Sequence, residues 1–267
     1  MSYSVKLYTK LIKIHIKSAF QYKLSFLTEL LGVVLGYIGN IIIYGIMFKS
    51  FHDLNGWSFW QIMFVYTYAM VAVNISNIFF SHFIQVDNEV ISGEFDKYLI
   101  RPIGSFKYYL ISKFNVSQFV SIFIGVAIFV KSAVQISFTY DFINVCKLII
   151  CLTGSVLINS ACMVIVGAIA FWTKKSQEIY DSILWPAQYL TFLPLSIFPK
   201  VIRWSFTYII PLAFLSFYPA SMFMEMENGN VNIKAYGMST LFVGVIFFLI
   251  SYFIWEVGVK KYEGSGN

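Results

Sequence analysis

The residues best suited to chemistry in this 267-residue sequence lie between Asp87 and Ile103. The stretch reads DNEVISGEFDKYLIRPI, so acids, a glycine, apolar side chains and an Arg-Pro pair follow one another closely. Gly93 lets the backbone turn between two short helices, and Pro102 disfavours helix at Arg101 and ends the second one. A short helix with one charged and one apolar face suits docking into a groove on another protein. An ordinary solvated loop at the membrane surface explains the same composition equally well.

Motifs for catalysis are absent from the sequence. It contains no Gly-x-x-x-x-Gly-Lys-Ser/Thr phosphate loop, no His-Glu-x-x-His and no Gly-x-Ser-x-Gly. The cysteines at 146, 151 and 162 have no metal-ligand spacing. We therefore expect no catalytic residue and no metal or cofactor bound by this chain, so any energy for pumping must come from a separate protein.

The composition is typical of a membrane protein. Hydrophobic residues make up 58% of the chain and charged residues only 12%, whereas soluble domains are roughly 25% charged. So few charges cannot give a protein of this size a water-compatible surface, which excludes a soluble enzyme and a disordered tail. The net charge of +6 fits basic residues on the inner membrane face, and no nucleic-acid motif accompanies it.

Charge-free runs predict an all-α, polytopic fold with six transmembrane helices in a single domain, 1–267. A spanning helix needs roughly 17–25 apolar residues. The expected spans are about 28–48, 59–81, 114–136, 147–172, 181–198 and 237–256.

Prolines complicate the region before the last span. Pro186, Pro194 and Pro199 interrupt or end the fifth span, because a proline inside a helix removes a hydrogen bond and kinks it. Segment 200–224 contains Pro211 and Pro219. Since broken backbone at membrane depth must be covered by protein or a wet cavity, we predict short re-entrant or interfacial helices there, broken at those two prolines.

Basic residues predict that the N-terminus is cytoplasmic, since Lys and Arg collect on that side. With six spans both termini are inside, and the inner segments carry about twice as many Lys and Arg as the outer ones. An arrangement with seven spans would place the C-terminal tail outside and would still leave more Lys and Arg on the inner side than on the outer side. The distribution of charge therefore does not decide between six and seven spans. The basic first segment, followed by no small-residue cleavage site, is unlike a signal peptide.

Residues 1–24 predict an amphipathic interfacial helix. Lys6, Lys10, Lys13 and Lys17 fall within about a 60° arc of a helical wheel, which suits a helix lying on an anionic inner leaflet. This helix either anchors the chain and sets its topology, or also contacts a cytosolic partner.

Neutral polar residues inside the expected spans are candidates for lining a substrate path. They are Asn40, Tyr66, Asn74, Asn77 and Gln188. Such groups could equally form hydrogen bonds between helices. No Asp, Glu or His falls at the middle of an expected span, which leaves a proton relay without residues.

Three stretches resemble bacterial ABC-2-type permeases. The string from Ser92 to Ile103 resembles the signature of that family. Two further matches are the proline-containing region with Trp185-Pro186, Phe198-Pro199, Ile210-Pro211 and Tyr218-Pro219, and the tail from Trp255 to Gly266. In the tail, Gly264 stands where the family pattern has Ser.

The resemblance implies the permease subunit of an ATP-driven exporter in the bacterial cell membrane, with six spans and both termini cytoplasmic. It implies a second permease, either another copy or a homologue, and two cytosolic ABC ATPase subunits that bind the ATP and Mg²⁺. It also makes 82–113 a coupling loop that contacts the ATPase through Glu89, Gly93, Glu94, Asp96, Leu99, Arg101 and Pro102. The family's substrates include drugs, peptides and lipid-linked molecules, and nothing in the sequence selects one.

Two other classes of function remain as alternatives. An ion- or proton-coupled carrier predicts charges at the middle of spans and inverted repeats, and neither is clear in the sequence. An integral-membrane enzyme or scaffold needs polar residues that converge near one leaflet.

Labelling of single cysteines tests the topology. A cysteine at position 228 is expected to react with a membrane-impermeant maleimide from outside, and one at position 265 only from inside, because six spans place both termini in the cytoplasm. Labelling of position 265 from outside would instead support seven spans.

Overall fold

The computed structural model describes residues 23–50, 56–102, 104–224 and 231–262. Over these residues the chain is helical and contains no strand, as predicted. The expected amphipathic helix at 1–24 lies almost entirely outside the described residues.

Five helices of the described chain are long and apolar enough to cross a membrane. They are α2 (Lys23–Ser50), α3 (Phe59–Phe80), α7 (Gln118–Gln135), α8 (Phe142–Thr173) and α13 (Val231–Lys261). They correspond to the predicted first, second, third, fourth and sixth spans. Charge-free runs located them because each run supplies enough apolar surface for a bilayer crossing.

The predicted fifth span, 181–198, is shorter and less regular. Its helical part consists of α9 (Ser176–Ile179), the π-helix η2 (Tyr180–Leu184) and α10 (Trp185–Leu190). Pro186 lies in the first turn of α10, and the wider π turn before it accommodates a residue that cannot donate to the preceding turn. The helix ends at Leu190, before Pro194, and a 3₁₀ turn η3 (Leu195–Ile197) follows. This segment is not among the five long helices, so the count of six spans stays a prediction.

Segment 200–224 forms short helices, as expected. They are α11 (Lys200–Tyr208), the 3₁₀ turn η4 (Leu212–Phe214) and α12 (Phe217–Ser221). Pro211 stands in the break between α11 and η4, as predicted. Pro219 instead lies within α12, in the first turn, where a backbone N–H has no partner inside the helix and its loss is tolerated. Re-entry of this segment into the membrane stays a prediction.

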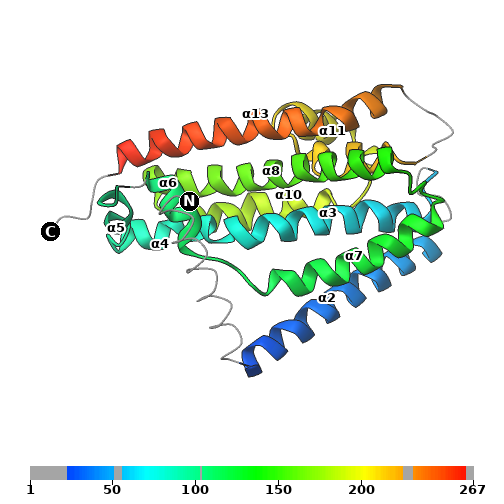
Figure 1. Ribbon diagram of the computed structural model, residues 1–267, viewed down its shortest axis with the longest axis horizontal. Helices are drawn as coiled ribbons and strands as arrows, with labels where there is room; N and C mark the ends of the chain where they lie inside the picture. Colours follow the sequence, from blue (N-terminus) through cyan, green and yellow to red (C-terminus); the bar gives the residue numbers. More distant parts are fainter. Residues whose placement is uncertain (1–22, 51–55, 103, 225–230, 263–267) are drawn as a thin grey trace.

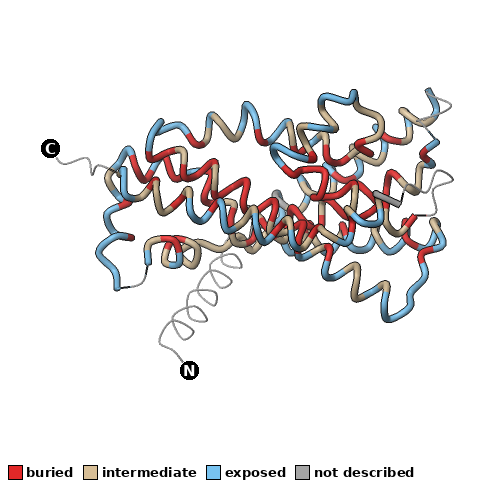
Figure 2. The backbone as a smooth tube through the Cα atoms, turned by 90° about the horizontal axis from the view of Figure 1, so that it is seen from above, coloured by how far each residue is buried: buried red, intermediate tan, exposed pale blue. Residues whose placement is uncertain are grey.

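Helices α3 and α8 form the centre of the molecule (Figures 1 and 2). Buried side chains occupy 78% of the most apolar stretch of α3 and 61% of that of α8, against 11% for α2. A capping box at Ser58 and Gln61 fixes where α3 begins: the hydroxyl of Ser58 accepts from the Gln61 N–H, and the Gln61 side chain accepts from the Ser58 N–H.

Helix α13 packs very closely against α8. A Cβ added to Gly154 would lie 2.6 Å from the backbone of Thr240, and one added to Gly244 would lie 2.5 Å from the carbonyl oxygen of Gly154. Small residues at helix contacts let the backbones approach in this way inside membranes. The two helices are therefore in direct backbone contact at these glycines.

The outer faces of α2, α7 and α13 are apolar and exposed. On α2 the exposed side chains recur every three or four residues: Leu27, Leu31, Leu35, Ile38, Ile42 and Ile46. This is the stripe of a helix with one face toward lipid or another apolar surface.

Residues 82–113, predicted to be cytoplasmic and called the inner loop below, fold into four short helices. They are η1 (Ser81–Gln85), α4 (Val86–Ile91), α5 (Asp96–Leu99) and α6 (Ser105–Ser112). Gly93 has φ +75°, so the predicted turn between two short helices is confirmed and glycine is the residue that tolerates it. Helix α5 ends at Leu99, ahead of Arg101 and Pro102. Figure 1 shows α5 and α6 near the C-terminal end of α13, whereas α4 packs against α8.

Candidate functional site

An aromatic cluster attaches the inner loop to the ends of two long helices. Phe95 is completely buried. The centroid of its ring lies 4.9 Å from that of Phe171 on α8, 6.0 Å from that of Trp255 on α13 and 5.2 Å from that of Tyr262. Each such pair adds about 0.5–1.5 kcal/mol beyond the burial of area. The loop is therefore held firmly against α8 and α13.

Trp255 is the other centre of this cluster and is also completely buried. Its ring centroid lies 5.0 Å from that of Phe83, 5.3 Å from that of Tyr109 and 5.1 Å from that of Phe171. These partners come from η1, α6 and α8. A single side chain of α13 thus contacts three separate elements at this end of the molecule.

Polar contacts close the inner loop on itself. The Lys113 ammonium donates to Glu89 Oε1 at 2.8 Å, and the Tyr98 hydroxyl donates to the same oxygen at 3.3 Å. His82 Nε2 lies 2.9 Å from the carbonyl oxygen of Tyr109, whose hydroxyl donates to the His82 carbonyl oxygen at 3.1 Å. Burial, with the nearby Glu89 carboxylate, raises the pKa of Tyr109 well above its usual value, so this hydroxyl remains a donor.

Glu89 is consequently an internal residue of the inner loop, with its carboxylate buried. Removing one partner of a buried pair leaves an uncompensated charge. This side chain therefore holds together the beginning and the end of the loop, and it does not face outward.

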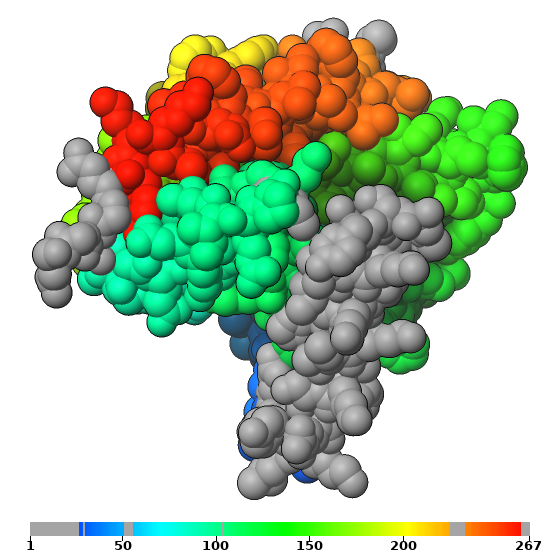
Figure 3. Space-filling model, turned by 60° about the vertical axis from the view of Figure 1, so that its left-hand side comes forward, coloured from blue at the N-terminus to red at the C-terminus, as the bar shows by residue number. Residues whose placement is uncertain are grey.

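The opposite face of the loop is exposed and mixed in character (Figure 3, blue-green). Leu99 and Ile100 are 42% and 80% exposed. Around these apolar groups lie the exposed residues Glu94, Asp96, Lys97, Arg101 and Pro102. Of the seven residues predicted to contact a partner, five lie on this exposed face, Gly93 forms the partly exposed turn and Glu89 is buried.

Two charges on this face have partners nearby. Lys97 donates to Glu94 at 2.9 Å, and that hydrogen bond lowers the pKa of Glu94, so the carboxylate stays ionised. The Arg101 guanidinium lies 5.5 Å from the ring centroid of Tyr108, within cation–π range.

The candidate path residues gather partly around Tyr66 on α3. Its ring centroid lies 5.3 Å from that of Tyr44 and 5.8 Å from that of Phe192, and Asn40 and Tyr189 are close enough to interact with its hydroxyl electrostatically. The Asn74 amide donates to the Tyr37 hydroxyl at 3.4 Å. This aromatic wall joins α2, α3 and the end of α10.

The candidate path residues also differ in their own hydrogen bonds. Gln188 on α10 donates to Asn159 Oδ1 on α8 at 2.6 Å, with both side chains buried. The Asn40 amide donates to the Gly36 carbonyl of its own helix at 2.9 Å. Asn77 has a buried amide oxygen with no hydrogen-bond partner in the described part of the chain.

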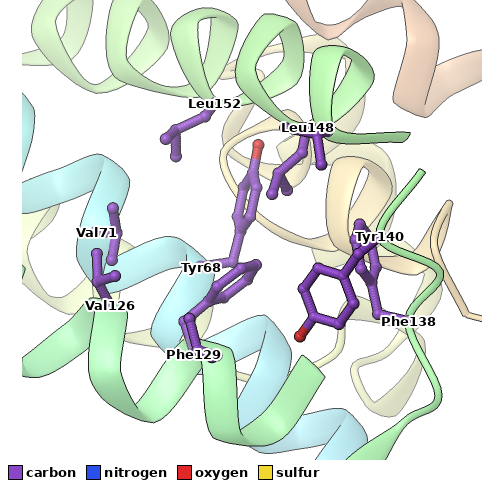
Figure 4. Close-up of a pocket in the computed structure, with 10 residues that line it drawn as sticks. Tyr68, Val71, Val126, Phe129, Phe138, Tyr140, Leu148 and Leu152 are labelled. Atoms are coloured by element: carbon purple, nitrogen blue, oxygen red, sulfur yellow. The ribbon is translucent and has the colours of Figure 1, made fainter. Parts of the chain in front are cut away.

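An apolar pocket of about 270 Å³ lies between α3, α7 and α8 (Figure 4). Its walls include Tyr68, Val71, Phe129, Leu148 and Leu152, and none of the five candidate path residues lines it. The Tyr68 hydroxyl is 3.0 Å from that of Ser155. Such a surface can hold hydrocarbon but offers no group for chemistry. Among the described residues, no three His, Cys, Asp or Glu side chains lie close enough together to hold a metal ion.

Comparison with known families settles the class of the protein. The model of a family described as "ABC-2 family transporter protein" matches residues 34–266. The chain belongs to this family. It is therefore a multi-pass membrane subunit of the ABC transporter class and not itself a catalytic ATPase. No curated protein matches the chain closely enough to be compared with it.

Several residues that organise this ABC-2 subunit were given no such structural role from the sequence. Phe171 and Trp255 fix the inner loop, and Asp87 and Ser176 are buried where the loop meets α9. The only local signal was the high density of aromatic residues between 79 and 109. Which distant residue completes each contact is not visible in a single sequence.

Replacing Phe95 tests whether the aromatic cluster holds the inner loop. Phe95→Ala is expected to lower the free energy of unfolding by about 3–5 kcal/mol, the usual cost of deleting a buried ring. Leu99→Ala, in the same loop but exposed, is the control and is expected to change it little. Thermal unfolding of the purified protein and limited proteolysis of the loop measure both. Equal effects of the two substitutions would contradict the described packing.

Proposed function

We propose that this chain is the permease subunit of an ATP-driven exporter in the bacterial cell membrane. It forms the translocation path and takes its driving force from a separate cytosolic ABC ATPase. Membership of the ABC-2 family supports the general class. The observation that carries the finer proposal is the exposed face of the inner loop, because that face belongs to a loop firmly attached to α8 and α13.

The exposed face has the composition of a docking surface. Its exposed apolar side chains include Leu99 and Ile100, and Glu94 and Arg101 are among its exposed charges. Protein interfaces commonly combine an apolar core with a polar rim, and a short helix seated in a groove is a recurrent mode of recognition. In the complex, α5 would sit in a groove of the ATPase.

Buried contacts would carry the force into the membrane. When the ATPase subunits bind ATP and close, they displace the inner loop, and Phe95 and Trp255 oblige the ends of α8 and α13 to follow. Tightly packed elements respond to such a displacement by moving as rigid bodies between two arrangements. No chemistry inside the membrane is required, and ATP and Mg²⁺ act on the partner.

The proposed orientation of the complex in the membrane rests on the distribution of its basic residues. The inner loop, Lys174, Lys175, Lys260 and Lys261 are assigned to the cytoplasm by the excess of basic residues there, and both termini accompany them. The exposed apolar face of α2 is available to a second permease, either a copy of this chain or a homologue. The wall around Tyr66, with Asn40, Asn74 and Gln188 nearby, is the proposed path.

The positions of the buried acids favour a driving force from a separate ATPase over coupling to an ion gradient. Within the described part of the chain, the buried acids are Asp87 and Glu89, and both belong to the inner loop. An ion-coupled carrier uses ionisable groups within its spans. Among the residues whose burial is described, no acid outside the inner loop is buried.

Charge reversal on the exposed face tests the docking. The double variant Glu94→Lys with Asp96→Lys, and separately Gly93→Pro, are expected to reduce recovery of the chain with its ATPase by at least about tenfold, because interface charges are opposed and the φ +75° turn is lost. The measurement is co-purification with the cytosolic ABC ATPase proposed as the partner, together with stimulation of its ATP hydrolysis.

Glu178→Lys is the matched control, since it reverses an exposed acid on the next inner loop and is expected to leave the complex intact. Thermal unfolding confirms that each variant is folded. If complex formation and stimulated hydrolysis survive both changes in the inner loop, the docking assignment is wrong.

A further inference from the structure

A second attachment of the inner loop lies away from its exposed face. Ser176, the first residue of α9, is completely buried. Its hydroxyl donates to the carbonyl oxygen of Ile84 at 2.7 Å and accepts from the N–H of Asp87 at 3.1 Å. The Asp87 carboxylate in turn accepts from the N–H of Gln177 at 2.9 Å. Three hydrogen bonds thus join the loop to the start of the helical segment Ser176–Leu190.

The junction between Asp87 and Ser176 is specific in its geometry. Buried polar groups must be paired, and the Ser176 hydroxyl, the Asp87 N–H and Asp87 Oδ2 each have a partner in the other segment. The Ser176 hydroxyl acts as donor and acceptor at once, so the loop cannot move relative to α9 without losing both bonds. A displacement of the loop is therefore passed to the helical segment.

The far end of the segment contacts the proposed path. Its fifteen residues, at 1.5 Å each, span roughly 20 Å. Gln188 is bonded to Asn159 at 2.6 Å, and Phe192, just beyond the helix, packs against Tyr66. Directly after the helix ends at Leu190, the chain is attached once more, because the Ser216 hydroxyl donates to the carbonyl oxygen of Thr191.

The middle of the segment is the π-helix Tyr180–Leu184. A π turn is wider than an α turn, is rare, and frequently marks functional positions in helices. In this turn only Leu184 is buried, whereas Asp181, Ser182 and Ile183 are exposed. Neighbouring elements therefore do little to oppose a change of turn type here, while both ends of the segment are tied down.

We propose that Asp87 and Ser176 are positioning residues that transmit the movement of the inner loop along the segment 176–190 to the wall formed by Tyr66 and Gln188. This inference rests on the proposed function, because the movement is the one imposed by the ATPase. It separates two roles of the loop: the exposed face binds the partner, and the buried junction passes the movement on.

The test uses the full complex of this chain with its ATPase in lipid nanodiscs. Tyr189, which is 46% exposed at the end of α10, is replaced by cysteine after Cys146, Cys151 and Cys162 have been changed to serine or alanine. The rate of maleimide labelling at position 189 is then compared without nucleotide and after trapping with ATP and vanadate. This readout requires no knowledge of the substrate.

Ser176→Ala and Asp87→Ala are the test variants. Asn88→Ala is the matched control, because this exposed neighbour of Asp87 keeps its backbone N–H and its side chain takes no part in the three bonds of the junction. In the parent complex and in the control, ATP trapping is expected to change the labelling rate several-fold. In the test variants this change is expected to disappear, while the ATPase still co-purifies and hydrolyses ATP. Ser176→Thr, which keeps the hydroxyl, is expected to restore it.

Each other outcome has a distinct meaning. If the test variants keep the full change in labelling, the junction does not transmit movement and the proposal is overturned. If they lose the ATPase, the junction merely folds the docking face, and the proposal is again overturned. If the parent complex itself shows no response to ATP, the proposed function fails, and the transmission role fails with it.

Discussion

Burial of Phe95 between Phe171 and Trp255 is the contact on which the rest of this structure depends. The inner loop is made of short helices that could not stay folded alone, since isolated helices of this length are unstable in water. The aromatic cluster supplies the missing stability and ties the loop to α8 and α13. Without that tie, a partner bound to the exposed face would move the loop and nothing else.

The long helices differ in how they can respond to such a movement. Helices α8 and α13 approach so closely at Gly154 and Gly244 that no side chain fits between them, so they behave as one unit. Helix α2 has 11% of its apolar stretch buried and is attached mainly through Tyr37 and Tyr44. A rigid centre with a loosely held first helix suits a protein in which helices must rearrange around a path.

The sequence predicted elements whose signals are local. Charge-free runs located five long helices, and Gly93 located the turn between α4 and α5, because backbone with positive φ favours glycine. Prolines indicated irregular structure after residue 181, but not the π turn before Pro186 nor the early end of α10. Those features depend on how the neighbouring elements cover the broken helix.

The candidate site was predictable in part for the same reason. The acids and apolar residues between 87 and 103 indicated a docking loop, yet the pattern did not show that Glu89 faces inward to Lys113 while Glu94 faces outward. The contacts of Asp87 with α9 join residues about ninety positions apart. No helical period links such residues, so only the folded chain brings them together.

The most direct test of this account is transport by reconstituted vesicles. Vesicles carrying this chain alone and vesicles carrying it with its ABC ATPase are compared for accumulation of labelled drugs, peptides and lipids, with ATP or with an imposed proton or sodium gradient. The account predicts that accumulation requires both proteins and ATP. Sustained accumulation by this chain alone, driven by an ion gradient, would contradict it.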